Sequence, residues 1–80
     1  MADQRSEKQV AASVLAYVRS IPSAVDNVWG IRQFWLGEPD MELSRIERAL
    51  QGLADEGLMG YRDEPLMLGG RVWYALQAAR

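Results

Sequence analysis

Acid–base catalysis could draw on two acidic pairs in this chain, Asp55-Glu56 and Asp63-Glu64. Each pair consists of sequence neighbours, and adjacency alone does not place two carboxyl groups around one substrate. A chain of 80 residues also rarely encloses the cleft that such chemistry requires. The chain has no histidine, no cysteine, no glycine-rich phosphate loop with lysine and no nucleophile elbow. We therefore expect no enzyme, no metal site and no cofactor.

A second feature is a run of three apolar residues, Leu66-Met67-Leu68, in an otherwise polar stretch. Exposed apolar loops tend to mark interfaces, and methionine adapts to varied partners. The run could therefore bind another protein. Alternatively, the loop folds back and covers the edge of a sheet.

Length and composition favour one small globular domain over residues 1–80. The chain is 49% hydrophobic and 25% charged, so disorder is expected only at residues 1–5. The amino terminus does not resemble a signal peptide, and the apolar runs are far shorter than the roughly 20 residues that span a bilayer. We expect a cytoplasmic protein without a membrane partner.

The spacing of apolar residues predicts a first helix over about 6–20. Ser6 and Gln9 form a predicted capping box, and Pro22 ends the helix. Residues 23–27 are polar and predict a turn.

A second, short helix is predicted over about 28–35. Asp26 or Asn27 can cap its start, and Gly37 is expected as a left-handed residue at its end. The large aromatic side chains need no functional explanation and are expected in the core: Trp29, Phe34, Trp35, Trp73 and Tyr74.

A third helix is predicted over about 40–56. Asp40 is a good N-cap, and Ser44 with Glu47 offers a capping box if the helix starts later. Gly57 is expected to end it. One face is apolar, formed by Leu43, Ile46, Leu50 and Leu53.

The remaining segments, 58–62 and 71–76, predict two strands. Val72, Tyr74 and Leu76 should point to one side of the sheet, and the residues between them to the other. Gly69-Gly70 supplies the positive backbone angles of a hairpin turn. The element order of three helices followed by a hairpin indicates an α+β fold.

The stretch 43–59 resembles the third helix and first wing strand of winged helix-turn-helix transcription regulators. The shared pattern begins with an apolar residue, has Leu four positions later and Leu again three positions after that. Gly follows four positions further on, and Leu and an apolar residue come directly after the Gly. In this chain those positions are Ile46, Leu50, Leu53, Gly57, Leu58 and Met59. The segment 71–76 is similar to the returning wing strand, and the resemblance covers roughly residues 8–76. It specifies a fold but no subfamily.

In that superfamily the third helix enters the major groove, and the wing touches the neighbouring backbone or minor groove. Arg45 and Arg48 are three residues apart and share a helix face, and an arginine fork can read guanine or hold a phosphate. The resemblance therefore implies a DNA-binding set of six residues: Ser44, Arg45, Arg48, Gln51, Arg62 and Arg71.

The chain departs from the superfamily pattern at residues 38–42, which lengthen the compact turn before the third helix and add acidic residues. Residues 40–56 contain two arginines and five carboxylates, a net charge of −3. Arg45 and Arg48 could therefore form exposed intrahelical pairs instead, each worth only about 0.3–0.5 kcal/mol.

Three hypotheses of function follow. The first is a transcriptional regulator that binds double-stranded DNA through a recognition helix at about 40–56, although the net charge of −2 counts against it. The second is a protein-interaction module of the same fold, which uses the acidic third helix or the apolar run 66–68. The third is a small subunit, or a homodimer-forming component, of a larger complex.

Overall fold

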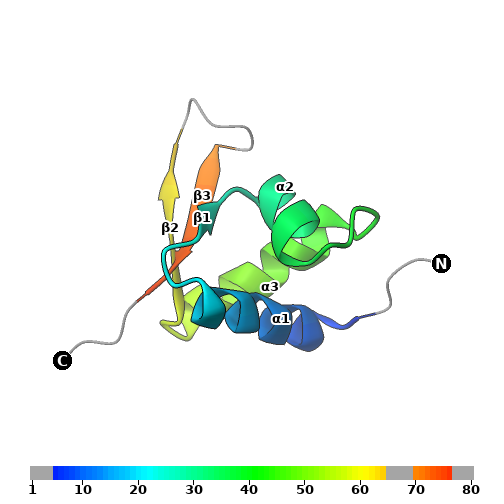
Figure 1. Ribbon diagram of the computed structural model, residues 1–80, viewed down its shortest axis with the longest axis horizontal. Coiled ribbons are helices and arrows are strands. Elements are labelled where there is room, and N and C mark those ends of the chain that lie inside the picture. The colour runs from blue at the N-terminus through cyan, green and yellow to red at the C-terminus, as the bar shows by residue number, and fades with distance from the viewer. Residues whose placement is uncertain (1–4, 65–69, 77–80) are drawn as a thin grey trace.

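The computed structural model describes residues 5–64 and 70–76. Within them, three helices pack against a three-stranded antiparallel sheet (Figure 1), so the predicted α+β class is confirmed. The second helix is α-helical at its start and π-helical at its end. The elements are, in chain order, α1 (Glu7–Ser20), β1 (Val25–Asp26), α2 (Val28–Gly30), η1 (Ile31–Trp35), α3 (Leu43–Asp55), β2 (Met59–Asp63) and β3 (Arg71–Ala75).

Helix α1 begins and ends where the sequence predicts. The Ser6 hydroxyl accepts a hydrogen bond from the backbone N–H of Gln9 at 3.2 Å. The Gln9 side-chain oxygen accepts one from the backbone N–H of Ser6 at 2.8 Å, which completes the predicted capping box. The helix ends at Ser20, because Pro22 cannot continue the hydrogen-bond ladder.

The second helix also starts at a predicted cap. The Asn27 side-chain oxygen accepts a hydrogen bond from the backbone N–H of Gly30 at 2.9 Å. Its last turn is wider than an α-helical turn, since the Leu36 N–H donates to the Ile31 carbonyl, five residues back, at 2.9 Å. Gly37 follows with φ of +65°, the predicted left-handed conformation.

The prediction that all large aromatics lie in the core is wrong for Phe34, whose exposed fraction is 68%. Ile31 and Trp35 take the inward positions of η1, so Phe34 points to solvent. Trp35 is buried and stacks on Tyr17 of α1, with ring centroids 4.8 Å apart. Among the other expected core aromatics, Trp73 is buried, whereas Trp29 and Tyr74 are half-buried.

Helix α3 begins at Leu43, later than about residue 40, and neither predicted cap is used. Its N-cap is Glu42, which makes no side-chain capping hydrogen bond. The residues before it form a turn in which the Met41 N–H donates to the Glu38 carbonyl at 3.0 Å. Met41 is only 2% exposed, so its burial takes this segment into the core and delays the helix. The end is as predicted, with Gly57 at φ of +77°.

The sheet has the order β1-β3-β2. The predicted hairpin is present, with Tyr61 opposite Trp73. Strand β1 was not predicted, because residues 23–27 carry the composition of a turn. It is only two residues long and is fixed by its neighbour, as Val25 pairs with Tyr74. Gly70 has φ of +71°, as the turn prediction requires, whereas Gly69 lies outside the described residues.

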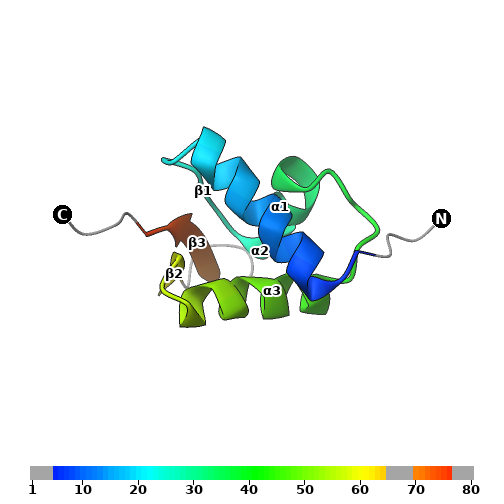
Figure 2. The ribbon, with the colours of Figure 1, turned by 90° about the horizontal axis from the view of Figure 1, so that it is seen from below.

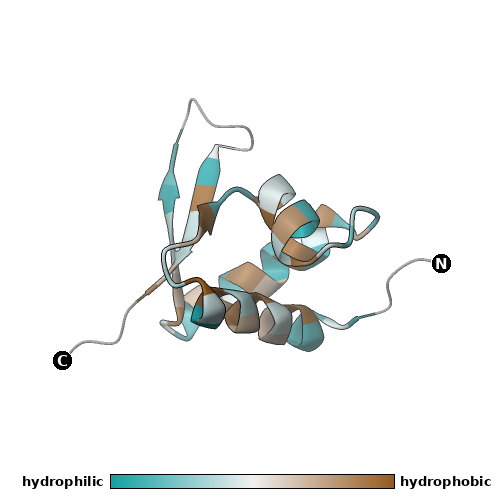
Figure 3. Ribbon diagram, in the orientation of Figure 1, coloured by the Kyte–Doolittle hydropathy of each residue, from teal (hydrophilic) through white to brown (hydrophobic). Residues whose placement is uncertain are grey.

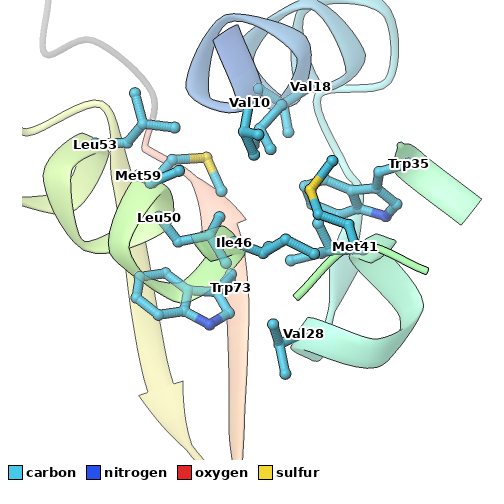
Figure 4. Packing of buried hydrophobic residues seen from close by; sticks show 13 residues of the cluster. Val10, Val18, Val28, Trp35, Met41, Ile46, Leu50, Leu53, Met59 and Trp73 are labelled. Atoms are coloured by element: carbon cyan, nitrogen blue, oxygen red, sulfur yellow. The ribbon is translucent and has the colours of Figure 1, made fainter. Parts of the chain in front are cut away.

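The core lies where the helices and the sheet meet. Helices α1 and α3 lie at an angle to each other (Figure 2), and the buried apolar side chains of both belong to one cluster. The close-up in Figure 4 shows Ile46 and Leu50 of α3 between Val10 of α1, Met41, and Trp73 of β3. The predicted inward face of the third helix is therefore confirmed. Among the described residues, the structure contains no helix that is long and apolar enough to cross a membrane.

Candidate nucleic-acid interface

Helix α3 has a buried side and an exposed side. Ile46, Ala49, Leu50 and Leu53 are buried. The side chains on the opposite side recur at spacings of three and four, which places them along one stripe of the helix. We call this stripe the outer face of α3; its members are all exposed and are Ser44, Glu47, Arg48, Gln51 and Asp55.

The two arginines of α3 contact the chain where α1 begins: Arg48 contacts its first residue, and Arg45 contacts a residue just before it. The Arg48 Nε donates to Glu7 Oε1 at 2.6 Å. The Arg45 Nη1 donates to the backbone carbonyl of Arg5 at 3.2 Å, and its Nη2 lies 3.4 Å from Glu42 Oε1. The sequence allowed both arginines to pair with nearby carboxylates. Arg45 does so, with Glu42, whereas Arg48 pairs with a glutamate of α1 and so bridges two helices. Because the Arg48 side chain is 61% exposed and that of Arg45 only 25%, Arg48 is the more accessible cation.

The polar residues of the outer face differ in how they are engaged. The Gln51 Nε2 donates to Asp55 Oδ1 at 3.1 Å, one helical turn further on. Ser44 and Glu47 are exposed and, among the residues that the structure describes, neither has a side-chain hydrogen bond or ion pair. Both are therefore available to a partner without breaking an existing contact.

The two predicted arginines of the hairpin lie on opposite faces of it. Arg71 is opposite Asp63 and Arg62 is opposite Val72, and successive side chains of a strand alternate between faces. The Arg71 Nε donates to Asp63 Oδ1 at 3.0 Å, and the Arg62 Nε donates to Glu64 Oε1 at 2.6 Å.

Arg71 is also held by an aromatic ring. Its guanidinium carbon lies 4.0 Å from the centre of the Tyr61 ring, and the Tyr61 and Trp73 rings have centroids 5.0 Å apart. An ion pair and a ring contact together orient the guanidinium. We call the hairpin face that carries Tyr61, Asp63, Arg71 and Trp73 the inner face of the hairpin.

The outer face of α3 and the inner face of the hairpin border one open hollow of about 220 Å³. Its rim is polar, and the end of the hairpin that borders it is hydrophilic (Figure 3). Of the six predicted residues, the structure brings Gln51 and Arg71 together here. The hollow is lined by Val28, Glu47, Gln51, Asp63, Gly70, Arg71 and Trp73.

Each arginine of the predicted DNA-binding set is paired with a carboxylate. Each of its four arginines has a carboxylate oxygen within 3.4 Å, supplied by Glu42, Glu7, Glu64 and Asp63 respectively. Exposed pairs of this kind contribute only about 0.2–1 kcal/mol. The arginines are therefore neutralised locally, but their partners hold them weakly.

Sequence reasoning missed two contributors to this region. The sequence predicts Glu47 as the capping-box partner of Ser44, yet it lies on the outer face and lines the hollow. Its position three residues after Ser44 and four before Gln51 is the signal that could have found it. Glu7, the partner of Arg48, is 41 residues away in sequence, and no local pattern connects the two.

The alternative interaction residues Leu66, Met67 and Leu68 lie outside the described residues, so the apolar-run hypothesis stays a prediction. In the described part of the chain, no group of three or more acidic side chains is placed to hold a metal ion. No family model, no curated protein and no solved structure matches this chain.

Proposed function

We propose that this chain is a winged-helix domain that binds double-stranded DNA, with the outer face of α3 in the major groove. The element order supports the fold assignment. A short strand follows the first helix, a hairpin follows the third, and the hairpin strand β3 pairs with both other strands. In this arrangement the hairpin is the wing.

The observation that carries the functional proposal is the shared hollow between the outer face of α3 and the inner face of the hairpin. A major groove about 12 Å wide admits one helix with its side chains, which is about 10–12 Å across. With α3 in the groove, the hairpin lies beside the helix and meets the adjoining sugar-phosphate backbone. Gln51 and Arg71 then face the same stretch of duplex.

The ion pairs of the arginines do not prevent phosphate binding. Arg48 and Arg62 are exposed and Arg71 is half-buried, and each is tied to a surface carboxylate. Exchange of such a carboxylate for a phosphate costs at most about 1 kcal/mol, because exposed pairs are worth no more than that. Arg45 is more buried and bonds a backbone carbonyl, so we assign it to fixing α3 against the beginning of α1.

A titration of the whole chain with a mixed-sequence 30-base-pair duplex at about 50 mM salt tests this proposal. Three phosphate contacts give a slope of log K against log salt of about −2.7, or about a 40-fold loss of affinity between 50 and 200 mM salt. Fluorescence anisotropy of a labelled duplex measures the affinity at each salt concentration and thus the slope. Absence of binding at high micromolar protein, in monomeric and dimeric preparations alike, contradicts the proposal.

A second candidate function is protein binding through the same outer face. The observation that favours it is charge: this face carries Glu47 and Asp55 against the single cation Arg48, which already has a carboxylate partner. The double substitution E47K/D55K separates the two functions. It strengthens binding to the mixed-sequence duplex if DNA is the partner, because two carboxylates are replaced by cations. If a second copy of the chain is the partner, sedimentation velocity of the wild type shows a dimer that the double variant loses.

A further inference from the structure

Glu47 differs from every other acidic side chain around the hollow and the outer face of α3. Asp55 accepts from Gln51, Asp63 accepts from Arg71, and the nearby Glu7 accepts from Arg48. Glu47 is exposed, lines the hollow, and has no hydrogen bond or ion pair among the described residues. It is therefore the carboxylate of this surface that is free to bind something else.

A carboxylate can only accept hydrogen bonds, and this restricts what it meets in a major groove. Guanine presents two acceptors there, and thymine presents an acceptor and a methyl group. Adenine presents an amino donor beside the N7 acceptor, which repels a carboxylate. Cytosine presents its N4 amino group without a neighbouring acceptor. Glu47 thus fits cytosine best among the four bases.

Gln51 defines where that cytosine lies relative to the next contact. The two residues are four positions apart on α3, a rise of roughly 6 Å along the helix, which corresponds to about two base-pair steps. Asp55 holds the Gln51 carboxamide through Nε2, which leaves its oxygen and second N–H for an adenine edge. The outer face of α3 therefore presents two separate reading positions.

We propose that Glu47 is a specificity-determining residue that accepts a hydrogen bond from the N4 amino group of one cytosine in the target duplex. This proposal rests on the proposed function. The carboxylate also repels phosphates, so a duplex without the cytosine in register binds less well. The Glu47 carboxylate thereby makes the affinity for a duplex depend on its base sequence.

Selection from a duplex library with a random central segment tests the assignment on the whole chain. Wild type, E47A, E47Q and the matched control E56Q are each taken through selection and sequencing. Glu56 follows the last residue of α3 and lines a different hollow, between α1 and α3, so E56Q removes the same charge near the same helix but away from the hollow that Glu47 lines. Thermal unfolding checks that all four chains are folded.

The wild type and E56Q are expected to enrich cytosine at one position, with about a 5- to 150-fold preference over the other bases, the usual range for one mismatched base pair. E47A loses the preference at that position only, and E47Q shifts it toward adenine, because a carboxamide fits the adenine edge. Sequence profiles that are the same for E47A and wild type overturn the assignment of Glu47 and leave the proposed function standing. If neither the wild type nor E56Q retains any duplex, the proposed function fails and this inference fails with it.

Discussion

The junction between β1 and α2 places the second helix against the sheet, and one glycine there permits a sharp test of the structure. A Cβ atom added to Gly30 would overlap the carboxylate of Asp26. The Asp26 carboxylate already makes a hydrogen bond, because its Oδ1 accepts from the backbone N–H of Asn27 at 2.8 Å. The substitution G30A must therefore move the Asp26 side chain and break this hydrogen bond.

Two effects of opposite sign decide the outcome for G30A. Alanine in place of glycine in a helix stabilises by up to about 1 kcal/mol. Loss of a hydrogen bond to a charged group costs about 1.5–3 kcal/mol. We expect a net loss of about 0.5–2 kcal/mol in the free energy of unfolding. For a chain of this length, that lowers the melting temperature by about 4–8 °C per kcal/mol.

The effect of G30A on the free energy of unfolding should change sign once the Asp26 side chain is removed. In a D26A background the clash is absent, so G30A should stabilise by about 0.5–1 kcal/mol, giving a coupling energy of about 2 kcal/mol between the two positions. Urea unfolding of the wild type, both single variants and the double variant measures this cycle. If G30A has the same effect in both backgrounds, the reasoning about Asp26 is refuted.

Three further predictions concern the core, the turn after α3 and the interface. L50A, which truncates a fully buried side chain, should cost about 2–5 kcal/mol in urea unfolding, whereas L58A, at an exposed leucine, should cost less than about 1 kcal/mol. G57A should destabilise by about 1–2 kcal/mol although its Cβ meets nothing within 4 Å, because φ is +77° there, and an unchanged melting temperature contradicts this. R48Q should lower the salt slope of duplex binding by about 1, and R19Q, on the exposed end of α1, should leave it unchanged.

The elements that the sequence predicts well are those with local causes. The capping box at Ser6 and Gln9 is formed by residues three apart, and the left-handed glycine at position 57 follows directly from the end of a helix. The apolar stripe of α3 is likewise a local pattern, and Ile46 and Leu50 are fully buried as it requires. Such features need no knowledge of the rest of the chain.

The features that the sequence does not predict depend on contacts between distant residues. Strand β1 exists because β3, almost 50 positions later in the chain, pairs with it. The late start of α3 follows from the burial of Met41 among side chains of other elements. The same holds for the candidate site, since the Arg48 partner Glu7 and the hollow shared by Glu47 and the hairpin are products of tertiary packing.

The division of α3 into two sides also determines how functional tests on this chain are to be interpreted. Its inner side is fixed by packing, so a substitution there changes stability and function together. The side chains of the outer face are exposed, and substitutions at exposed positions usually change stability by less than about 0.5 kcal/mol. A change in duplex selection by E47A, with the melting temperature unchanged, therefore reports a lost contact to the partner and not a damaged fold. Formal net charge sums the whole surface, so it does not show whether one face binds DNA. Substitutions of the side chains that face the hollow test that face directly.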